Sequence, residues 1–146
     1  MIGMDRPPAH KRRPLTVTLL LLVVLIIAVM NIIRIEASLR YWKTLSDIGV
    51  SPGPLYILLT GLFWSIAFLG LFVGLWLGHP RSRIAGLILV PLYLIYSWVD
   101  RMAFQNTVPR ENTSFAVAVT FLVVFYTLFT LLLPANQHYF SRENEQ

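Results

Sequence analysis

Two charged residues lie beside apolar runs, where a charge is costly. Arg34 directly follows the uncharged run Leu15 to Ile33, and Asp100 directly follows the uncharged run Ile84 to Val99. If both helices begin on the same side of a membrane, Arg34 lies about 28 Å along its helix and Asp100 about 24 Å along, at 1.5 Å per residue. These similar depths allow the two side chains to form an ion pair near one membrane boundary, or to reach water independently.

Neutral polar residues share the helix faces of these two charges. Asn31 precedes Arg34 by three residues, and Tyr93 and Tyr96 precede Asp100 by seven and four, so each set lines one face of its helix. The first interpretation is a purely structural ion pair. The second is an outward-facing polar pocket, formed by these five residues, that holds a lipid headgroup or a small polar ligand.

Small residues form a second pattern, which predicts helix packing. Four of them lie on one face of the apolar run 55–78: Ala67, Gly70, Gly74 and Gly78. Three more share a face of the run 114–133: Ala116, Thr120 and Thr127. Because lipid provides no hydrophobic drive between helices, association in a membrane depends on the close backbone approach that small residues permit. Packing within the chain is the first expectation, and an interface with another subunit is the alternative.

Groups that commonly carry chemistry are scarce in this sequence. It contains no cysteine, which excludes disulfides, thiolate metal sites and thiol-dependent redox enzymes. Its three histidines, His10, His79 and His138, are far apart and lie outside the apolar runs, so we predict no metal site and no cofactor. No hydrolase, metalloprotease or phosphate-binding motif occurs. An enzyme is therefore less favoured than a protein without catalytic activity.

The composition predicts an all-α integral membrane protein. Of 146 residues, 56% are hydrophobic and 13% charged, whereas soluble domains carry about a quarter charged residues. About 20 apolar residues cross a bilayer core of about 30 Å as a helix. Four stretches are expected to do so, in an up-down antiparallel bundle: 15–33, 55–78, 84–101 and 114–133. The third reaches full length only if its helix continues through Asp100 and Arg101.

The first span continues into charged sequence without a helix-breaking residue. In the outer segment 34–48, apolar residues recur at helical spacing while Arg40, Lys43 and Asp47 point elsewhere. This pattern predicts an amphipathic helix, either an extension of the first span or a separate helix at the membrane surface. The Gly- and Pro-rich stretch from Gly49 to Pro54 must end it.

Basic residues near the span ends predict the orientation. Seven would lie on one side: Arg6, Lys11, Arg12, Arg13, Arg81, Arg83 and Arg142. Five would lie on the other: Arg34, Arg40, Lys43, Arg101 and Arg110. The positive-inside bias then places both polar tails, 1–14 and 135–146, in the cytoplasm. The first apolar run exceeds the core of a signal peptide, so we expect it to be retained, in a bacterial inner membrane.

Two functions are compatible with these patterns. The first is a non-enzymatic accessory or scaffold subunit of a membrane complex, or a homo-oligomer, because packing residues are present and reactive groups are scarce. The alternative is a binder or carrier of a lipid-like or small polar molecule. The expected partners are the lipid bilayer and other membrane subunits or a second copy. Nucleic acid is not expected, since lipid headgroups account for the net charge of +5.

Overall fold

The computed structural model describes residues 14–49, 51–104 and 112–133, and these residues form helices joined by short links. In chain order the helices are α1 (Leu15–Arg40), α2 (Trp42–Asp47), α3 (Pro54–Leu77), α4 (Pro80–Phe104) and α5 (Thr113–Leu132). The predicted tails 1–14 and 135–146 lie outside the described residues apart from Pro14. Four of the helices, α1, α3, α4 and α5, are long and apolar enough to cross a membrane, as expected of a multi-pass membrane protein.

Helix α1 continues well beyond the apolar run, as predicted. Its 26 residues give a length of about 39 Å, which exceeds the bilayer core of about 30 Å. The helix ends at Arg40, and Tyr41 separates it from the six-residue α2. The outer segment 34–48 is therefore both an extension of the first span and a second short helix. No residue of α2 is buried, so α2 contributes nothing to the core.

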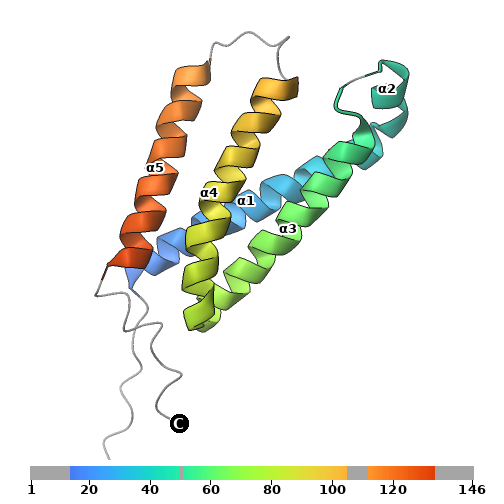
Figure 1. The fold of residues 1–146 in the computed structure, drawn as a ribbon. Coiled ribbons are helices and arrows are strands. Elements are labelled where there is room, and N and C mark those ends of the chain that lie inside the picture. Colours follow the sequence, from blue (N-terminus) through green and yellow to red (C-terminus); the bar gives the residue numbers. More distant parts are fainter. Residues whose placement is uncertain (1–13, 50, 105–111, 134–146) are drawn as a thin grey trace, which may run out of the picture.

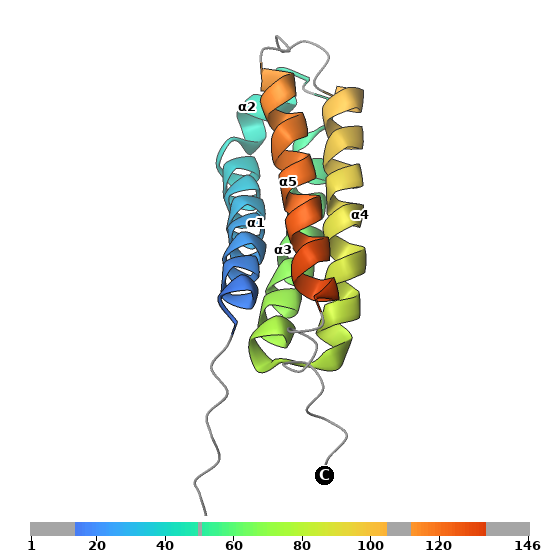
Figure 2. The ribbon, with the colours of Figure 1, turned by 90° about the vertical axis from the view of Figure 1, so that its left-hand side faces the viewer.

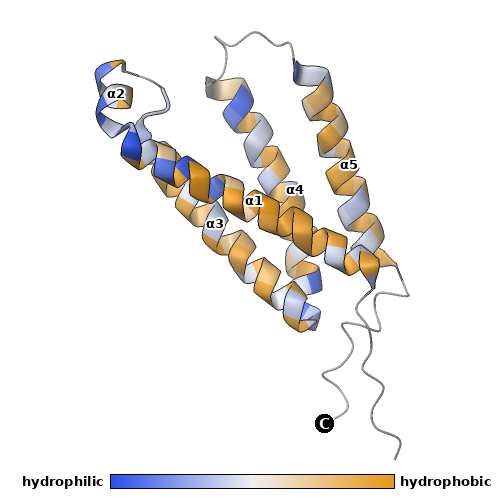
Figure 3. Ribbon diagram, turned by 180° about the vertical axis from the view of Figure 1, so that it is seen from behind, coloured by the Kyte–Doolittle hydropathy of each residue, from blue (hydrophilic) through white to orange (hydrophobic). Residues whose placement is uncertain are grey.

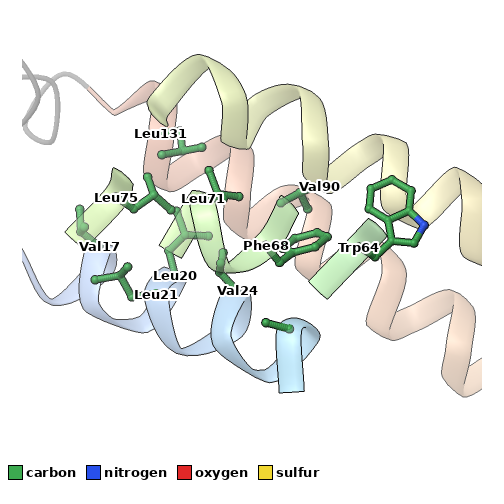
Figure 4. Close-up of a cluster of buried hydrophobic side chains, with 11 residues drawn as sticks. Val17, Leu20, Leu21, Val24, Trp64, Phe68, Leu71, Leu75, Val90 and Leu131 are labelled. Atoms are coloured by element: carbon green, nitrogen blue, oxygen red, sulfur yellow. The ribbon is translucent and has the colours of Figure 1, made fainter. Parts of the chain in front are cut away.

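Helices α1 and α3 form the closest pair in the molecule. The buried residues of α1 recur every three or four positions and face α3: Val17, Leu20, Leu21, Val24, Ala28, Asn31 and Ser38. The buried residues of α3 recur at a similar spacing: Gly61, Trp64, Ser65, Phe68, Leu71 and Leu75. This spacing is typical of helices that pack nearly lengthwise with interdigitating side chains. Figure 4 shows the apolar residues of both helices meeting in one core, which Val90 and Leu131 complete.

Helices α3 and α4 are joined by only two residues. Gly78 ends α3 with a φ of 73°, a left-handed conformation that glycine adopts readily. Helix α4 begins at Pro80, where the missing N–H costs nothing in the first turn. Helix α4 therefore begins about one turn before residue 84, where the third span was predicted to start. As predicted, α4 continues through Asp100 and Arg101, and it remains one helix across Pro91.

The four long helices share two ends (Figures 1 and 2). One end, called the outer end below, carries α2, the end of α4 and the start of α5. The other, called the inner end, carries Leu15, the link between α3 and α4, and the end of α5. Helix α4 packs against α3 and α5, and α5 also contacts α1.

The surface of the helices is largely hydrophobic. Large apolar side chains are exposed on all four long helices, for example Ile26, Phe63, Ile95 and Phe125. Figure 3 shows hydrophobic residues along the helices and hydrophilic ones concentrated near their ends and on α2. A water-soluble monomer does not expose apolar area on this scale. Lipid is the solvent that such a surface fits.

Candidate functional site

Arg34 and Asp100 form an ion pair, one of the two arrangements that their sequence positions allowed. Nη2 of Arg34 lies 3.4 Å from Oδ2 of Asp100, which joins α1 to α4 near the outer end. The Arg34 side chain is 33% exposed and that of Asp100 only 13%, so the carboxylate is the more deeply enclosed partner. Removing a carboxylate from water is costly unless a cation or hydrogen bonds compensate it. The guanidinium of Arg34 provides this compensation.

Asn31 lies one helical turn deeper than this pair and is completely buried. Its Nδ2 donates to the backbone oxygen of Ile27 at 2.8 Å and to the hydroxyl of Tyr93 on α4 at 3.3 Å. Its Oδ1 has no hydrogen-bond partner among the described residues. Buried amide oxygens normally accept a hydrogen bond. Asn31 therefore has unused capacity to bind a donor at this depth.

An aromatic cluster connects Asn31 to the apolar core. Trp64 packs edge-on against Tyr93, with ring centroids 5.1 Å apart, and lies 5.3 Å from Tyr96. Phe68 contacts the other side of Tyr93, again at 5.1 Å and edge-on. Such edge-to-face pairs stabilise beyond the area they bury. The rings hold α3 and α4 together beneath the ion pair.

Two further residues contribute to this region, of which Tyr56 was not predicted from the sequence. Tyr56 on α3 lies next to Tyr96 and Asp100 and adds a third phenol to the site. Gly61 lets α3 approach α1 closely, because a Cβ atom there would lie 3.2 Å from the backbone oxygen of Asn31. Gly61 lies three residues before the buried Trp64, whereas Tyr56 lies about 140° around the helix from Gly61 and has no such signal in the sequence.

The five predicted pocket residues thus come together as one group, defined here as the outer polar cluster: Asn31, Arg34, Tyr93, Tyr96 and Asp100. The printed contacts join Arg34 to Asp100 and Asn31 to Tyr93, and Trp64 bridges the two tyrosines. Every such contact links one helix to another. The cluster therefore fastens α1, α3 and α4 together, and it contains no nucleophile paired with a base.

Comparison with known proteins assigns no family to this chain. No family model matches it, and no curated protein or solved structure is similar to it. Within the described residues, no group of three His, Cys, Asp or Glu residues could hold a metal ion. Of the three histidines weighed as a metal cluster, only His79 is among the described residues, and His10 and His138 lie outside them.

Further polar contacts fasten α5 to its neighbours. Trp98 of α4 donates from Nε1 to the hydroxyl of Thr120 at 3.1 Å, near the outer end. At the inner end, Nε of Arg83 donates to the backbone oxygen of Leu131 at 2.7 Å. The hydroxyl of Tyr126 donates to the backbone oxygen of Thr16 on α1 at 2.8 Å. Interhelical bonds of this kind are the usual role of polar groups in membrane bundles.

The predicted stripe of small residues on α3 is divided among different environments. At Gly74 a Cβ atom would lie 2.9 Å from Cβ of Ser82, so α3 and α4 approach closely there. Gly78 forms the turn. Gly70 is exposed, with nothing within 4 Å of a Cβ position, and Ala67 lines the same open groove. The closest approach of α3 to α1 instead occurs at Gly61.

The small-residue face predicted on α5 faces other helices of the bundle. Thr127 is buried, and its Oγ1 has no hydrogen-bond partner among the described residues. Thr120 accepts from Trp98 and donates back to the carbonyl of Ala116 at 2.8 Å, so this part of the face contacts α4. The Thr120 end of this face therefore packs against α4.

Proposed function

We propose that this protein is a non-enzymatic accessory or scaffold subunit of a membrane complex, or forms a homo-oligomer. In this proposal its four spans cross a bacterial inner membrane as an up-down antiparallel bundle, with both termini in the cytoplasm. The polar groups of the outer polar cluster form interhelical contacts that stabilise the bundle. The protein acts by presenting a helical surface to another membrane subunit or to a second copy.

The observation that carries this proposal is the low burial of α5. In the most apolar 18-residue windows of α5 and of α4, 17% of the residues are buried, against 28% in α3 and 33% in α1. A membrane helix is held by packing and interhelical hydrogen bonds, because lipid is as apolar as its side chains. Apart from the hydrogen bonds of Arg83, Trp98 and Tyr126, its own chain therefore covers little of α5. A partner helix would supply the missing contacts.

The free face of α5 carries a ridge of aromatic side chains. Phe121 and Phe125 are stacked, with ring centroids 6.3 Å apart, and Phe129 continues the ridge one turn further. All three are more than half exposed. Aromatic residues are enriched among those that dominate binding at protein interfaces. This ridge is the contact surface that the proposal assigns to a partner.

Native mass spectrometry after gentle detergent extraction tests this function. We expect a second polypeptide, identical or different, in stoichiometric amount with the chain. Truncating the ridge in the double variant Phe121→Ala/Phe125→Ala should weaken the association about tenfold or more, since one tenfold step corresponds to about 1.4 kcal/mol.

A matched variant controls for the loss of apolar bulk. Ile26 and Met30 are exposed on α1, so Ile26→Ala/Met30→Ala removes large side chains from another outward face. This control should retain the partner. The proposal would be contradicted if the unmodified protein is already monomeric. It would also be contradicted if the ridge variant and the control variant lose the partner equally.

A second function is favoured by one specific observation, the unpartnered oxygen of Asn31. Asn31 is 0% exposed, and its Oδ1 could accept a hydrogen bond from a small polar molecule or a lipid headgroup. In this alternative the outer polar cluster binds or carries that molecule. The supporting result would be a metabolite or lipid retained in stoichiometric amount and lost in Asn31→Leu.

A further inference from the structure

A groove runs along α3 and α4 from the inner end toward the middle of the spans. Its volume is about 500 Å³, and its lining includes Gly70 of α3 and Ala85 and Leu89 of α4. The lining is apolar along its length and becomes polar at the inner end, where His79 and Arg81 contribute. An occupant must therefore be apolar in its deep part and polar at the inner boundary.

The shape of the groove favours a thin chain over a helix. A docking helix would need small residues over two successive turns of α3, as in a GxxxG face. Only Gly70 offers open space there, because Ser82 occupies the surface at Gly74 and Gly78 lies in the turn. Gly70 lies seven residues before Leu77, the last residue of α3, or about 10 Å deeper at 1.5 Å per residue. A flexible hydrocarbon chain can reach and fill this space.

The charge at the mouth of the groove selects an anion. Arg81 and His79 are exposed there, and helix α4 begins at Pro80, which adds the positive end of its dipole. The described acidic residues, Glu36, Asp47 and Asp100, all belong to the outer end.

The other groups near the mouth are already engaged. Arg83 donates to the backbone oxygen of Leu131, and the hydroxyl of Ser82 donates to the backbone oxygen of His79 at 2.6 Å. Neither Arg34 nor Arg40 can help, since each pairs with a carboxylate at the outer end. In the part of the chain that the structure describes, Arg81 therefore carries the free guanidinium that can bind an anionic group at this point.

We propose that this groove binds one anionic glycerophospholipid of the adjoining leaflet. The guanidinium of Arg81 binds its phosphate, and one acyl chain extends over Gly70. Basic pockets between membrane helices bind anionic headgroups in this way, and one arginine near the surface contributes about a fivefold preference. The site is separate from the Phe121–Phe125 ridge of α5, so it does not depend on the proposed function.

Retained lipid measured by native mass spectrometry tests this site. The intact protein is exchanged into detergent micelles with equimolar phosphatidylglycerol and phosphatidylcholine of the same acyl chains. We expect about fivefold more phosphatidylglycerol than phosphatidylcholine bound, one molecule per chain. Arg81→Met should bring this ratio to about one, because the phosphate loses its cation. Gly70→Leu should lower retention of both lipids, because a leucine fills the space of the acyl chain.

Two variants at the outer end are matched controls. Lys43→Met removes the same charge from α2, and Gly53→Leu adds the same side chain before α3, where nothing lies within 4 Å of a Cβ position. Both should bind lipid as the unmodified protein does. An unchanged lipid ratio in Arg81→Met would overturn the proposal. So would a second polypeptide that occupies the groove and is lost from Gly70→Leu in place of lipid.

Discussion

Gly61→Leu is expected to destabilise the protein by forcing α1 and α3 apart. A Cβ atom at this position would lie 3.0 Å from Cγ1 of Ile35 and 3.2 Å from the backbone oxygen of Asn31. The backbone of α1 cannot yield as a flexible side chain can, so α1 and α3 must move apart. Overpacking of this kind costs about 1–3 kcal/mol, and the loss appears as a lower midpoint when the detergent-solubilised protein is titrated with SDS.

Gly70→Leu provides the matched control on the same helix. Both substitutions replace a helix-interior glycine with leucine and so gain the same helix propensity. They differ in their surroundings, because Gly70 is next to open space whereas Gly61 contacts α1. Measured in detergent without added lipid, Gly70→Leu should unfold at the same SDS concentration as the unmodified protein or a higher one. Equal destabilisation by both variants would show that α3 packs on α1 through a different face.

Arg34→Met should destabilise the protein more than Asp100→Leu. Without Arg34, the 13% exposed carboxylate of Asp100 loses its cation, whereas without Asp100 the 33% exposed Arg34 can extend toward water. We expect a loss of about 1–3 kcal/mol for Arg34→Met and less than about 1 kcal/mol for Asp100→Leu. SDS titration of the two single variants measures the difference.

The double variant separates a structural pair from a binding site. Arg34→Met/Asp100→Leu leaves neither charge unpaired, so it should recover most of the stability lost in Arg34→Met. If it does so and any retained small molecule persists, the pair acts only as a fastening. Loss of a retained molecule from a stable double variant would instead support the second function. A double variant as unstable as the sum of the two single variants would mean that the side chains do not interact.

Features that depend on local sequence were predictable. Four uncharged runs gave four long helices, because backbone groups in lipid must be satisfied within a helix. The absence of Gly or Pro after Ile33 predicted the continuation of α1. Helix α4 begins four residues before the predicted span 84–101, because that span was started after the charged residues Arg81 and Arg83. Pro80 is nevertheless a strong signal for a first helical turn.

Features that depend on which faces meet were harder to predict. The similar depths of Arg34 and Asp100 could be predicted, but whether the two side chains pair or reach water separately could not. The contact of Gly61 with α1 could not be predicted, because the glycine stripe from Gly70 to Gly78 is the stronger local pattern of small residues. Packing depends on the partner surface as well, and Asn31 and Ile35 of α1 face Gly61. Sequence periodicity gives the faces of each helix but not their pairing.

Cysteine accessibility tests the central claim most directly, namely that four helices cross a bilayer with their two ends on opposite sides. The chain contains no cysteine, so single substitutions report one position each. A membrane-impermeant maleimide is applied to intact cells and then to permeabilised ones. Lys43→Cys and Met102→Cys should react in intact cells, and Arg81→Cys only after permeabilisation. Reaction of Lys43→Cys and Met102→Cys from opposite sides, or recovery of the protein from the water-soluble fraction, would contradict the account.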